Sequence, residues 1–142
     1  YYLSHIPALV RALYPHWIWR YETAEKVLFL TFDDGPTPDI TPFVLDQLAQ
    51  YEARATFFLI GANVEKYPEL AQRIAADGHA IGNHTQHHVR GRATAIRPYL
   101  EEVAAAQQAI FRHTGLQPRL FRPPYGSLTR RQSCALRNGF EI

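Results

Sequence analysis

Two adjacent carboxylates, Asp33 and Asp34, follow the apolar run of residues 27–30 and come just before Gly35 and Pro36. The run predicts a buried strand over residues 27–32, and the residues after it predict a tight turn. Two negative charges this close disfavour each other's ionised form unless a cation or a specific reaction uses them. The pair therefore indicates a metal site, although turns rich in Asp, Gly and Pro also occur for backbone reasons alone.

Three histidines within five residues form the second candidate: His84, His87 and His88. A helical turn beginning near Asn83 would place His84 and His88 on one face, with their Cβ atoms roughly 5 to 6 Å apart. Two imidazoles and one carboxylate suit zinc, and this set leaves one tetrahedral position open for water, as in catalytic sites. A polar helix face is the alternative, and it is the better interpretation for an isolated histidine.

Arg122 and Tyr125 stand in a rigid loop, which is the third candidate. The loop follows two apolar residues, 120–121, and contains Pro123 and Pro124. Proline fixes its own φ and restricts the residue before it, so Arg122 and the amide of Tyr125 are held with little freedom. Rigid donors of this kind suit the stabilisation of a transition state. A surface salt bridge and a packed aromatic ring are the structural alternatives.

The elements of the chain must bring these segments together. From residue 26 onward, apolar strand-like segments alternate with amphipathic helix-like segments. The expected strands are residues 27–32, 56–60, 80–81 and 119–122, with a fifth beginning at 140–142, and the expected helices are residues 40–48, 68–77, 100–111 and 127–136. This alternation predicts parallel strands joined by right-handed crossovers. Every candidate segment then follows the carboxyl end of a strand, so we expect all three on one rim, where barrel enzymes carry their chemistry.

Composition sets further bounds. The chain has 142 residues, of which 46% are hydrophobic and 20% are charged, as in one globular domain or part of one. The net charge is +2 with mixed signs along the chain, and no basic stripe argues for a nucleic-acid partner. The apolar stretch at residues 9–20 is broken by Arg11 and Pro15 and is too short to span a membrane. We expect residues 1–26 to form an arm packed over one end of the domain, with an interfacial segment as the alternative.

Taken together, the three segments resemble the polysaccharide deacetylases of the NodB-homology type, a metal-dependent carbohydrate esterase family. The first motif of the family, TFDDGP, is present at residues 31–36, and the second, H-[S/T]-x-x-H, is present at residues 84–88. The third, around R-P-P-Y, is present at residues 122–125. The resemblance covers residues 27–142. It implies an α/β fold of the distorted TIM-like (β/α)7 barrel type, here incomplete, with about five strands.

The resemblance also implies roles for individual residues. Asp34, His84 and His88 correspond to the ligands of a divalent metal, with zinc as the expected ion, although a three-histidine set that includes His87 is an alternative. Asp33 corresponds to the general base, Arg122 to the group that orients it and keeps it ionised, and the backbone N–H of Tyr125 to an oxyanion donor. Thr85 is the [S/T] position, where a hydrogen bond that fixes the histidines is expected.

The implied activity is hydrolysis of acetyl groups on N-acetylated glycans, such as peptidoglycan, chitin-type oligomers or an exopolysaccharide. An O-acetyl esterase acting on acetylxylan and a non-catalytic glycan- or metal-binding relative are the alternatives. A glycan substrate of this class favours the cell envelope or an extracytoplasmic location, and the sequence carries no signal for an oligomeric state.

One expected component of the reaction is missing from the sequence. The resemblance places the general acid, a histidine, in a late Leu-x-x-x-His motif, which does not occur before Ile142. The other histidines match no family motif; they are His5, His16, His79 and His113. We therefore predict that residues 27–142 are truncated at the carboxyl side of the domain. Expressed alone, this stretch is expected to bind zinc but to deacetylate poorly.

Overall fold

A computed structural model describes residues 11–12, 15, 17–21 and 23–142. Within these residues, four strands form one parallel sheet in the order β1-β2-β3-β4. The strands are β1 (Leu30–Gly35), β2 (Ala55–Leu59), β3 (Ala80–Asn83) and β4 (Leu120–Phe121). The α-helices are α2 (Thr41–Gln50), α3 (Gly61–Lys66), α4 (Pro68–Ala76), α5 (Ile96–Thr114) and α6 (Arg130–Leu136), and two short 3₁₀ helices are η1 (Gly91–Ala93) and η2 (Pro124–Gly126). The predicted parallel alternation of strands and helices is therefore present.

Strand β1 differs from the prediction in position and in burial. It begins at Leu30 rather than at residue 27 and continues through both carboxylates to Gly35. Leu28 and Phe29 lie outside the strand and are exposed, and Leu30 is 41% exposed. The expectation of a buried strand was wrong because β1 lies at the edge of the described sheet, where it pairs with β2 alone.

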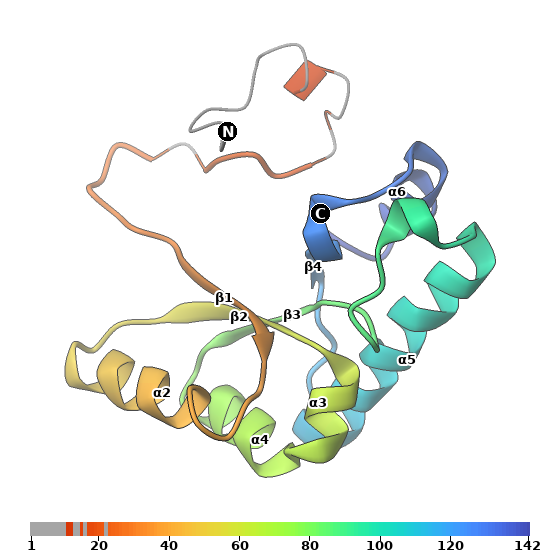
Figure 1. The fold of residues 1–142 in the computed structure, drawn as a ribbon. Helices are drawn as coiled ribbons and strands as arrows, with labels where there is room; N and C mark the ends of the chain where they lie inside the picture. The colour runs from red at the N-terminus through yellow and green to blue at the C-terminus, as the bar shows by residue number, and fades with distance from the viewer. Residues whose placement is uncertain (1–10, 13–14, 16, 22) are drawn as a thin grey trace.

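The two faces of the sheet have different surroundings. The helices α2, α3, α4 and α5 lie on one side of it (Figure 1). Alternate residues of β2 point to this side and join the main core, which comprises Leu45, Leu48, Ala55, Phe57, Leu59, Val64, Ala71, Ile74, Ile81 and Ile110. A fully buried side chain of this kind contributes roughly 1.5 to 3 kcal/mol. Phe58 points to the opposite face, where the Arg122 guanidinium lies 4.0 Å from its ring centroid. That face is therefore available to the candidate residues.

Helix α3 was not predicted, because Gly61 looked like the end of a strand. The glycine has a packing role instead. A Cβ atom at residue 61 would lie 2.0 Å from Oε1 of Gln86 and 2.7 Å from Cα of Ala106. The absence of a side chain thus allows α3 to approach α5 and the loop after β3 closely.

A second core joins α5, β4 and α6, and it consists of Tyr99, Val103, Phe121, Leu128 and Leu136. Thr129 caps α6 in a capping box with Gln132, so the helix begins at Arg130 rather than at the predicted residue 127. Trp17 donates a hydrogen bond from Nε1 to Oγ of Ser133 at 2.8 Å, so the described part of the amino-terminal segment contacts α6. The rest of the stretch at residues 9–20 lies partly outside the described residues.

The carboxyl end of the chain continues the sheet. Leu120 and Glu141 form a single parallel bridge, supported by a hydrogen bond from the Phe121 amide to the Glu141 carbonyl at 2.8 Å. The fifth strand expected at residues 140–142 is thus present only as this bridge. In the described part of the chain, no helix has both the length and the apolar character needed to cross a bilayer.

His79, just before β3, makes folding sensitive to acid. Burial lowers the pKa of His79, and the positive charge of Arg54 lowers it further. The side chain is 5% exposed, packs on Phe57 and has no partner for Nδ1 among the described residues. An unfolded histidine takes up a proton near pH 6.5. Because the folded state remains neutral there, the unfolded state binds more protons and stability falls as the pH decreases below about 6.5.

We predict that His79→Phe, which keeps an aromatic ring on Phe57, reduces this acid destabilisation. The slopes of unfolding free energy against pH can differ between the two proteins by about 1.4 kcal/mol per pH unit at most, which is the limit for one titrating group. Thermal unfolding of both proteins at several pH values between about 8 and 5 measures it. The comparison at about pH 8, where His79 is neutral in both states, isolates the packing effect. Parallel stability curves for the two proteins would contradict the assignment to His79.

Candidate active site

Asp33 and Asp34 reach the same rim because of a bulge in β1. Asp33 pairs with Phe58 and Gly35 with Leu59, so Asp34 is the extra residue, and its φ of 67° lies in the left-handed region. Such a bulge takes a side chain out of the regular alternation of a strand. Asn63 of α3 donates a hydrogen bond to the Asp34 carbonyl at 2.8 Å and so supports the bulge. The carboxylates are not buried, since the side chains of Asp33 and Asp34 are 38% and 61% exposed. The expected penalty for burying two charges therefore does not apply.

The histidine segment is a loop and not the predicted helical turn. Residues 84–90 carry no helix, and Thr85 and His88 have φ values of 66° and 56°. These left-handed residues fold the loop back so that the rings of His84 and His88 lie 5.0 Å apart between centroids. The two side chains therefore lie close together, but on a folded loop rather than on one face of the predicted helical turn. Thr85 accepts a hydrogen bond from the Val89 amide at 3.3 Å and so fixes the loop rather than a histidine ring.

Asp34, His84 and His88 form a group that could hold a metal ion. One ligand atom from each lies within 4.8 Å of the others. Nε2 of His84 and Nε2 of His88 are 3.4 and 3.1 Å from Oδ1 of Asp34. Within the described part of the chain, no other group of three or more His, Cys, Asp or Glu residues has this geometry. His87 points elsewhere, because its Nδ1 contacts Oε1 of Glu102 at 2.8 Å, so the three-histidine alternative lacks support.

The protonation of His84 fits a metal ligand. Its side chain is 3% exposed, and Nδ1 lies 2.6 Å from the Arg122 carbonyl oxygen, which can only accept, so Nδ1 carries the proton. Burial lowers the pKa of His84 and favours its neutral form. Nε2 therefore presents a lone pair toward the Asp34 carboxylate, and a cation between these two atoms would relieve their repulsion. The donor set suits zinc, which accepts imidazole nitrogen and carboxylate oxygen.

Arg122 connects the parts of the site. Its Nη1 donates to Oδ1 of Asp33 at 2.7 Å and to Oγ1 of Thr31 at 2.9 Å. Its guanidinium lies over the ring of Phe58, which limits its movement further. The backbone of the same residue binds His84 through its carbonyl and Asn83 through its amide. The carboxylate of Asp33 is thus held in a fixed orientation beside Asp34, His84 and His88, the candidate metal-binding group.

Tyr125 lies against the histidines from the other side. Its ring centroid is 4.6 Å from that of His88, and the guanidinium of Arg90 lies 4.5 Å from the centroid of Tyr125. The φ of Tyr125 is 59°, so this residue too adopts a left-handed backbone. The side chain is 61% exposed. Tyr125 therefore forms an accessible wall of the site, and its backbone conformation is fixed by the proline-rich loop.

Several residues that support the site were not identified from the sequence. Asn83 is fully buried, donates from Nδ2 to the Val103 carbonyl and to Gln107, and accepts from the Thr85 amide. Gln107 interrupts the apolar stripe of α5, and this interruption was the available signal for a buried polar contact. Glu102 of the same helix binds both the amide and the ring of His87. The loop that carries His84 and His88 is thus anchored to α5.

Comparison with known proteins bears on the identity of this site. A sequence model of the polysaccharide deacetylase family matches residues 20–140. The chain belongs to this family. It is 42% identical over 112 residues to a peptidoglycan-N-acetylglucosamine deacetylase of Bacillus cereus, covering 79% of this chain and 40% of that protein. It is 45% identical over 106 residues to a chitooligosaccharide deacetylase of a Bradyrhizobium species, covering 73% of this chain and 48% of that protein.

A solved structure supports the fold. The peptidoglycan deacetylase PdaC from Bacillus subtilis matches with a TM-score of 0.80 at 34% identity, covering 84% of this chain and 58% of that one. The structural relatives are distorted (β/α)7 barrels, and the described sheet is an incomplete part of such a barrel. The predicted fold class is therefore confirmed. The chain spans about half or less of the length of the curated relatives given above.

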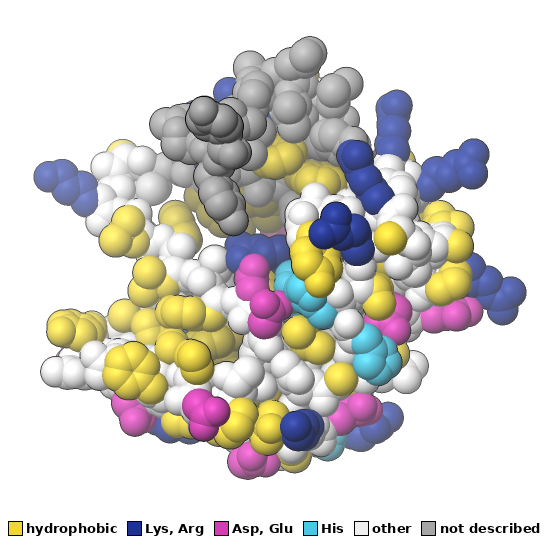
Figure 2. All heavy atoms as spheres, viewed as in Figure 1, with side chains coloured by type: hydrophobic (Ala, Val, Ile, Leu, Met, Phe, Trp, Pro, Cys, Tyr) yellow, Lys and Arg dark blue, Asp and Glu magenta, His cyan; other side chains and the backbone are white. Residues whose placement is uncertain are grey.

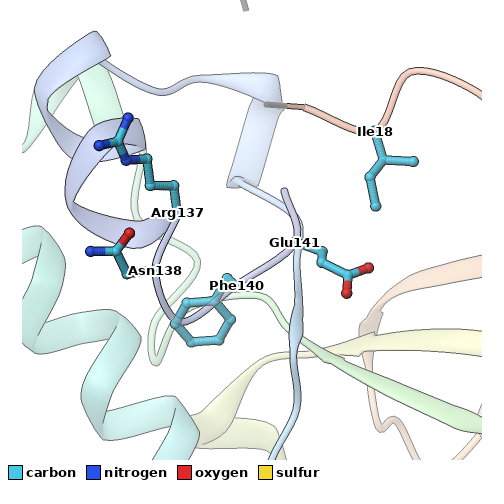
Figure 3. Close-up of a pocket in the computed structure, with 5 residues that line it drawn as sticks. All are labelled: Ile18, Arg137, Asn138, Phe140 and Glu141. Carbon is cyan, nitrogen blue, oxygen red and sulfur yellow. The ribbon is translucent and has the colours of Figure 1, made fainter. Parts of the chain in front are cut away.

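A surface hollow of about 400 Å³ lies elsewhere in the chain. It is lined by Ile18, Arg137, Asn138, Phe140 and Glu141 (Figure 3). None of these residues belongs to the metal-binding group, so the hollow is not the centre of the candidate site.

We predict that His84→Ala and His88→Ala each abolish stoichiometric zinc binding, because each removes one of three ligands and leaves too few donors. His87→Ala, which removes an imidazole from the same loop without removing a ligand, is the matched control and should keep the zinc. Elemental analysis of the dialysed proteins measures the metal content, and circular dichroism checks the fold. Unchanged zinc in both ligand variants would place the metal elsewhere.

Proposed function

We propose that this site belongs to a metal-dependent hydrolase that removes acetyl groups from N-acetylated glycans. The observation that carries the proposal is the convergence of Asp34, His84 and His88 with the Asp33 carboxylate, which Arg122 holds beside them. A divalent ion bound there, most suitably zinc, would polarise the acetyl carbonyl and lower the pKa of a bound water. The three-ligand set leaves room for that water.

The residues of the chain have distinct tasks in this proposal. Asp33 accepts the proton of the attacking water, since its carboxylate lies at the rim and does not belong to the metal-binding group. Arg122 keeps Asp33 oriented through the 2.7 Å hydrogen bond. The backbone N–H of Tyr125 donates to the oxygen that becomes negative during attack, a contribution of roughly 2.7 to 4 kcal/mol for such donors. The Tyr125 loop suits this task because Pro123 and Pro124 restrict it.

N-acetylated glycans are the proposed substrates because the relatives are described as deacetylases of peptidoglycan N-acetylglucosamine and of chitooligosaccharides. Esters of acetic acid, as in acetylxylan, present the same carbonyl carbon, so an assay must include them. A substrate in the cell wall would place the protein in the cell envelope. A relative that binds glycan without turnover would bind acetylated oligomers and release no acetate.

We further propose that residues 27–142 work as part of a larger domain. A general acid for the leaving amine is needed, and His79 is buried against Phe57 while His113 lies on α5. His5 and His16 lie outside the described residues. The test compares acetate release by this chain with acetate release by a protein that contains it together with about 60 further residues. This length is taken from the smallest barrels. Equal acetate release from both would remove the need for the larger domain.

We predict that Asp33→Asn keeps the metal and lowers kcat by roughly 10²- to 10⁴-fold, because it removes the proton acceptor but no ligand. Asp34→Asn should instead weaken metal binding. Acetate release from N-acetylglucosamine oligomers and from acetylxylan, measured with metal content on the same samples, separates the two roles. If Asp33→Asn lost zinc while Asp34→Asn kept it, the two roles would have to be exchanged.

A further inference from the structure

Charges that look mixed along the chain are in fact segregated between segments. Residues 87–100 and 115–140 contain eight arginines, no lysine and no Asp or Glu. The whole chain has 15 Lys and Arg against 13 Asp and Glu, so the other segments together are acidic. These two basic segments carry His88 and Tyr125 of the candidate site.

The fold joins the two segments into one packed unit. Gln132 of α6 donates from Nε2 to the carbonyls of Gly91 and Thr94, at 2.9 and 3.0 Å. The Arg92 amide donates to Oγ of Ser127 at 3.3 Å. A Cβ atom at Gly91 would lie 2.2 Å from the Ser127 carbonyl oxygen, so the two backbones are in direct contact. The arginines next to Gly91 and next to Gln132 therefore project from adjoining backbone.

We call the exposed arginines beside Gly91 and on or next to α6 the arginine flank, which comprises Arg90, Arg92, Arg130, Arg131 and Arg137. Arg119 is also exposed, but it precedes β4 and is not included. In the described part of the chain, none of the five has a carboxylate at ion-pairing distance. In contrast, the neighbouring Arg97 pairs with Glu101, and Arg122 pairs with Asp33. Figure 2 shows Lys and Arg side chains gathering over α6 at the upper right, beside His and carboxylate side chains nearer the middle of this face. Five uncompensated guanidinium groups make this surface strongly positive.

The arginine flank begins at the candidate site itself. Arg90 covers the Tyr125 ring at 4.5 Å, and Tyr125 contacts the metal-binding His88. At the far end of α6, Arg137 lines the hollow with Asn138 (Figure 3). A polymer that places one acetyl group at the metal-binding group can therefore extend over the flank.

We infer that the arginine flank binds carboxylate groups of an acidic glycan, so that the preferred substrate carries carboxylates near the acetylated sugar. The inference rests on the proposed function, because the glycan is the substrate of the same site. Guanidinium groups pair well with carboxylates, often through two hydrogen bonds. A single-stranded nucleic acid is less suited, because binding it usually requires exposed aromatic rings for base stacking. The Tyr125 ring beside Arg90 is 61% exposed and already contacts both the Arg90 guanidinium and the His88 ring.

The test compares one glycan in two forms: N-acetylated oligomers of an acidic glycan with free carboxylates, and the same oligomers as methyl esters. The protein used contains this chain within its larger domain. Each exposed ion pair contributes roughly a twofold to fivefold effect, so the free acid should have a kcat/KM about tenfold higher. The preference should appear mainly in KM and should fade at high salt, which screens exposed charges.

The variant Arg92→Gln/Arg130→Gln/Arg131→Gln should lose this preference and keep its activity on the methyl ester. The matched control Arg54→Gln/Arg97→Gln/Arg112→Gln removes the same charge outside the arginine flank and should retain the preference. Thermal unfolding checks both for folding. A loss of preference in the control as well would assign the effect to net charge and overturn the inference.

A binding measurement separates this inference from the proposed function. Fluorescence anisotropy with a labelled oligogalacturonate, which carries carboxylates and no acetyl group, reports on the flank without turnover. If the protein bound the oligogalacturonate through the three arginines and yet released no acetate from any glycan tested, that result would contradict the proposed function and leave the inference about the arginine flank standing. Acetate release at equal rates from the free acid and the methyl ester would contradict the role of the arginine flank and leave the proposed function standing. Tighter binding of a single-stranded oligonucleotide of equal charge would overturn the choice of a glycan.

Discussion

The arrangement of the site depends on Arg122, which contacts residues of β1 and β2 and residues at the end of β3. Its side chain binds Asp33 and Thr31 of β1 and lies over Phe58 of β2, while its backbone binds Asn83 and His84 at the end of β3. A parallel sheet places these strand ends on one edge but does not fix the side chains relative to one another. Arg122 adds that second constraint. The same residue orients the carboxylate of Asp33 and selects the tautomer of His84.

The site also stores backbone strain. Five non-glycine residues among those described have a positive φ, and four of them are Asp34, Thr85, His88 and Tyr125. Each such conformation costs of order 1 to 3 kcal/mol and persists only where the surroundings enforce it. The buried amide of Asn83, the contacts of Glu102 and the proline-rich loop supply this enforcement. The large helix α5 therefore acts as the support of the site, and part of its packing energy offsets this strain.

Much of the site could be predicted because topology alone determines where strand ends meet. The carboxylate pair lies at the carboxyl end of β1, and the histidines and the Arg122 loop follow β3 and β4, so their convergence required no knowledge of side-chain contacts. The backbone between His84 and His88 could not be predicted in this way. A helical turn and a left-handed loop both bring residues four apart together, and the choice depends on contacts with the distant residues Glu102, Val103 and Arg122. The burial of β1 was likewise mispredicted, because an apolar run does not reveal that its strand lies at an edge.

The distribution of charge was hidden for a related reason. Along the sequence, acidic residues such as Glu101 and Glu102 separate the two basic segments, and the composition looks balanced. In the fold, both carboxylates lie on α5, where Glu101 pairs with Arg97 and Glu102 with His87 rather than with the arginine flank. The contacts of Gln132 then join the basic segments beside Tyr125. One packed unit thus supports the Tyr125 loop and presents the arginines. A glycan bound to the arginines would therefore lie at a fixed offset from the Tyr125 loop, so that the proposed charge recognition and the proposed positioning for the reaction depend on the same contacts.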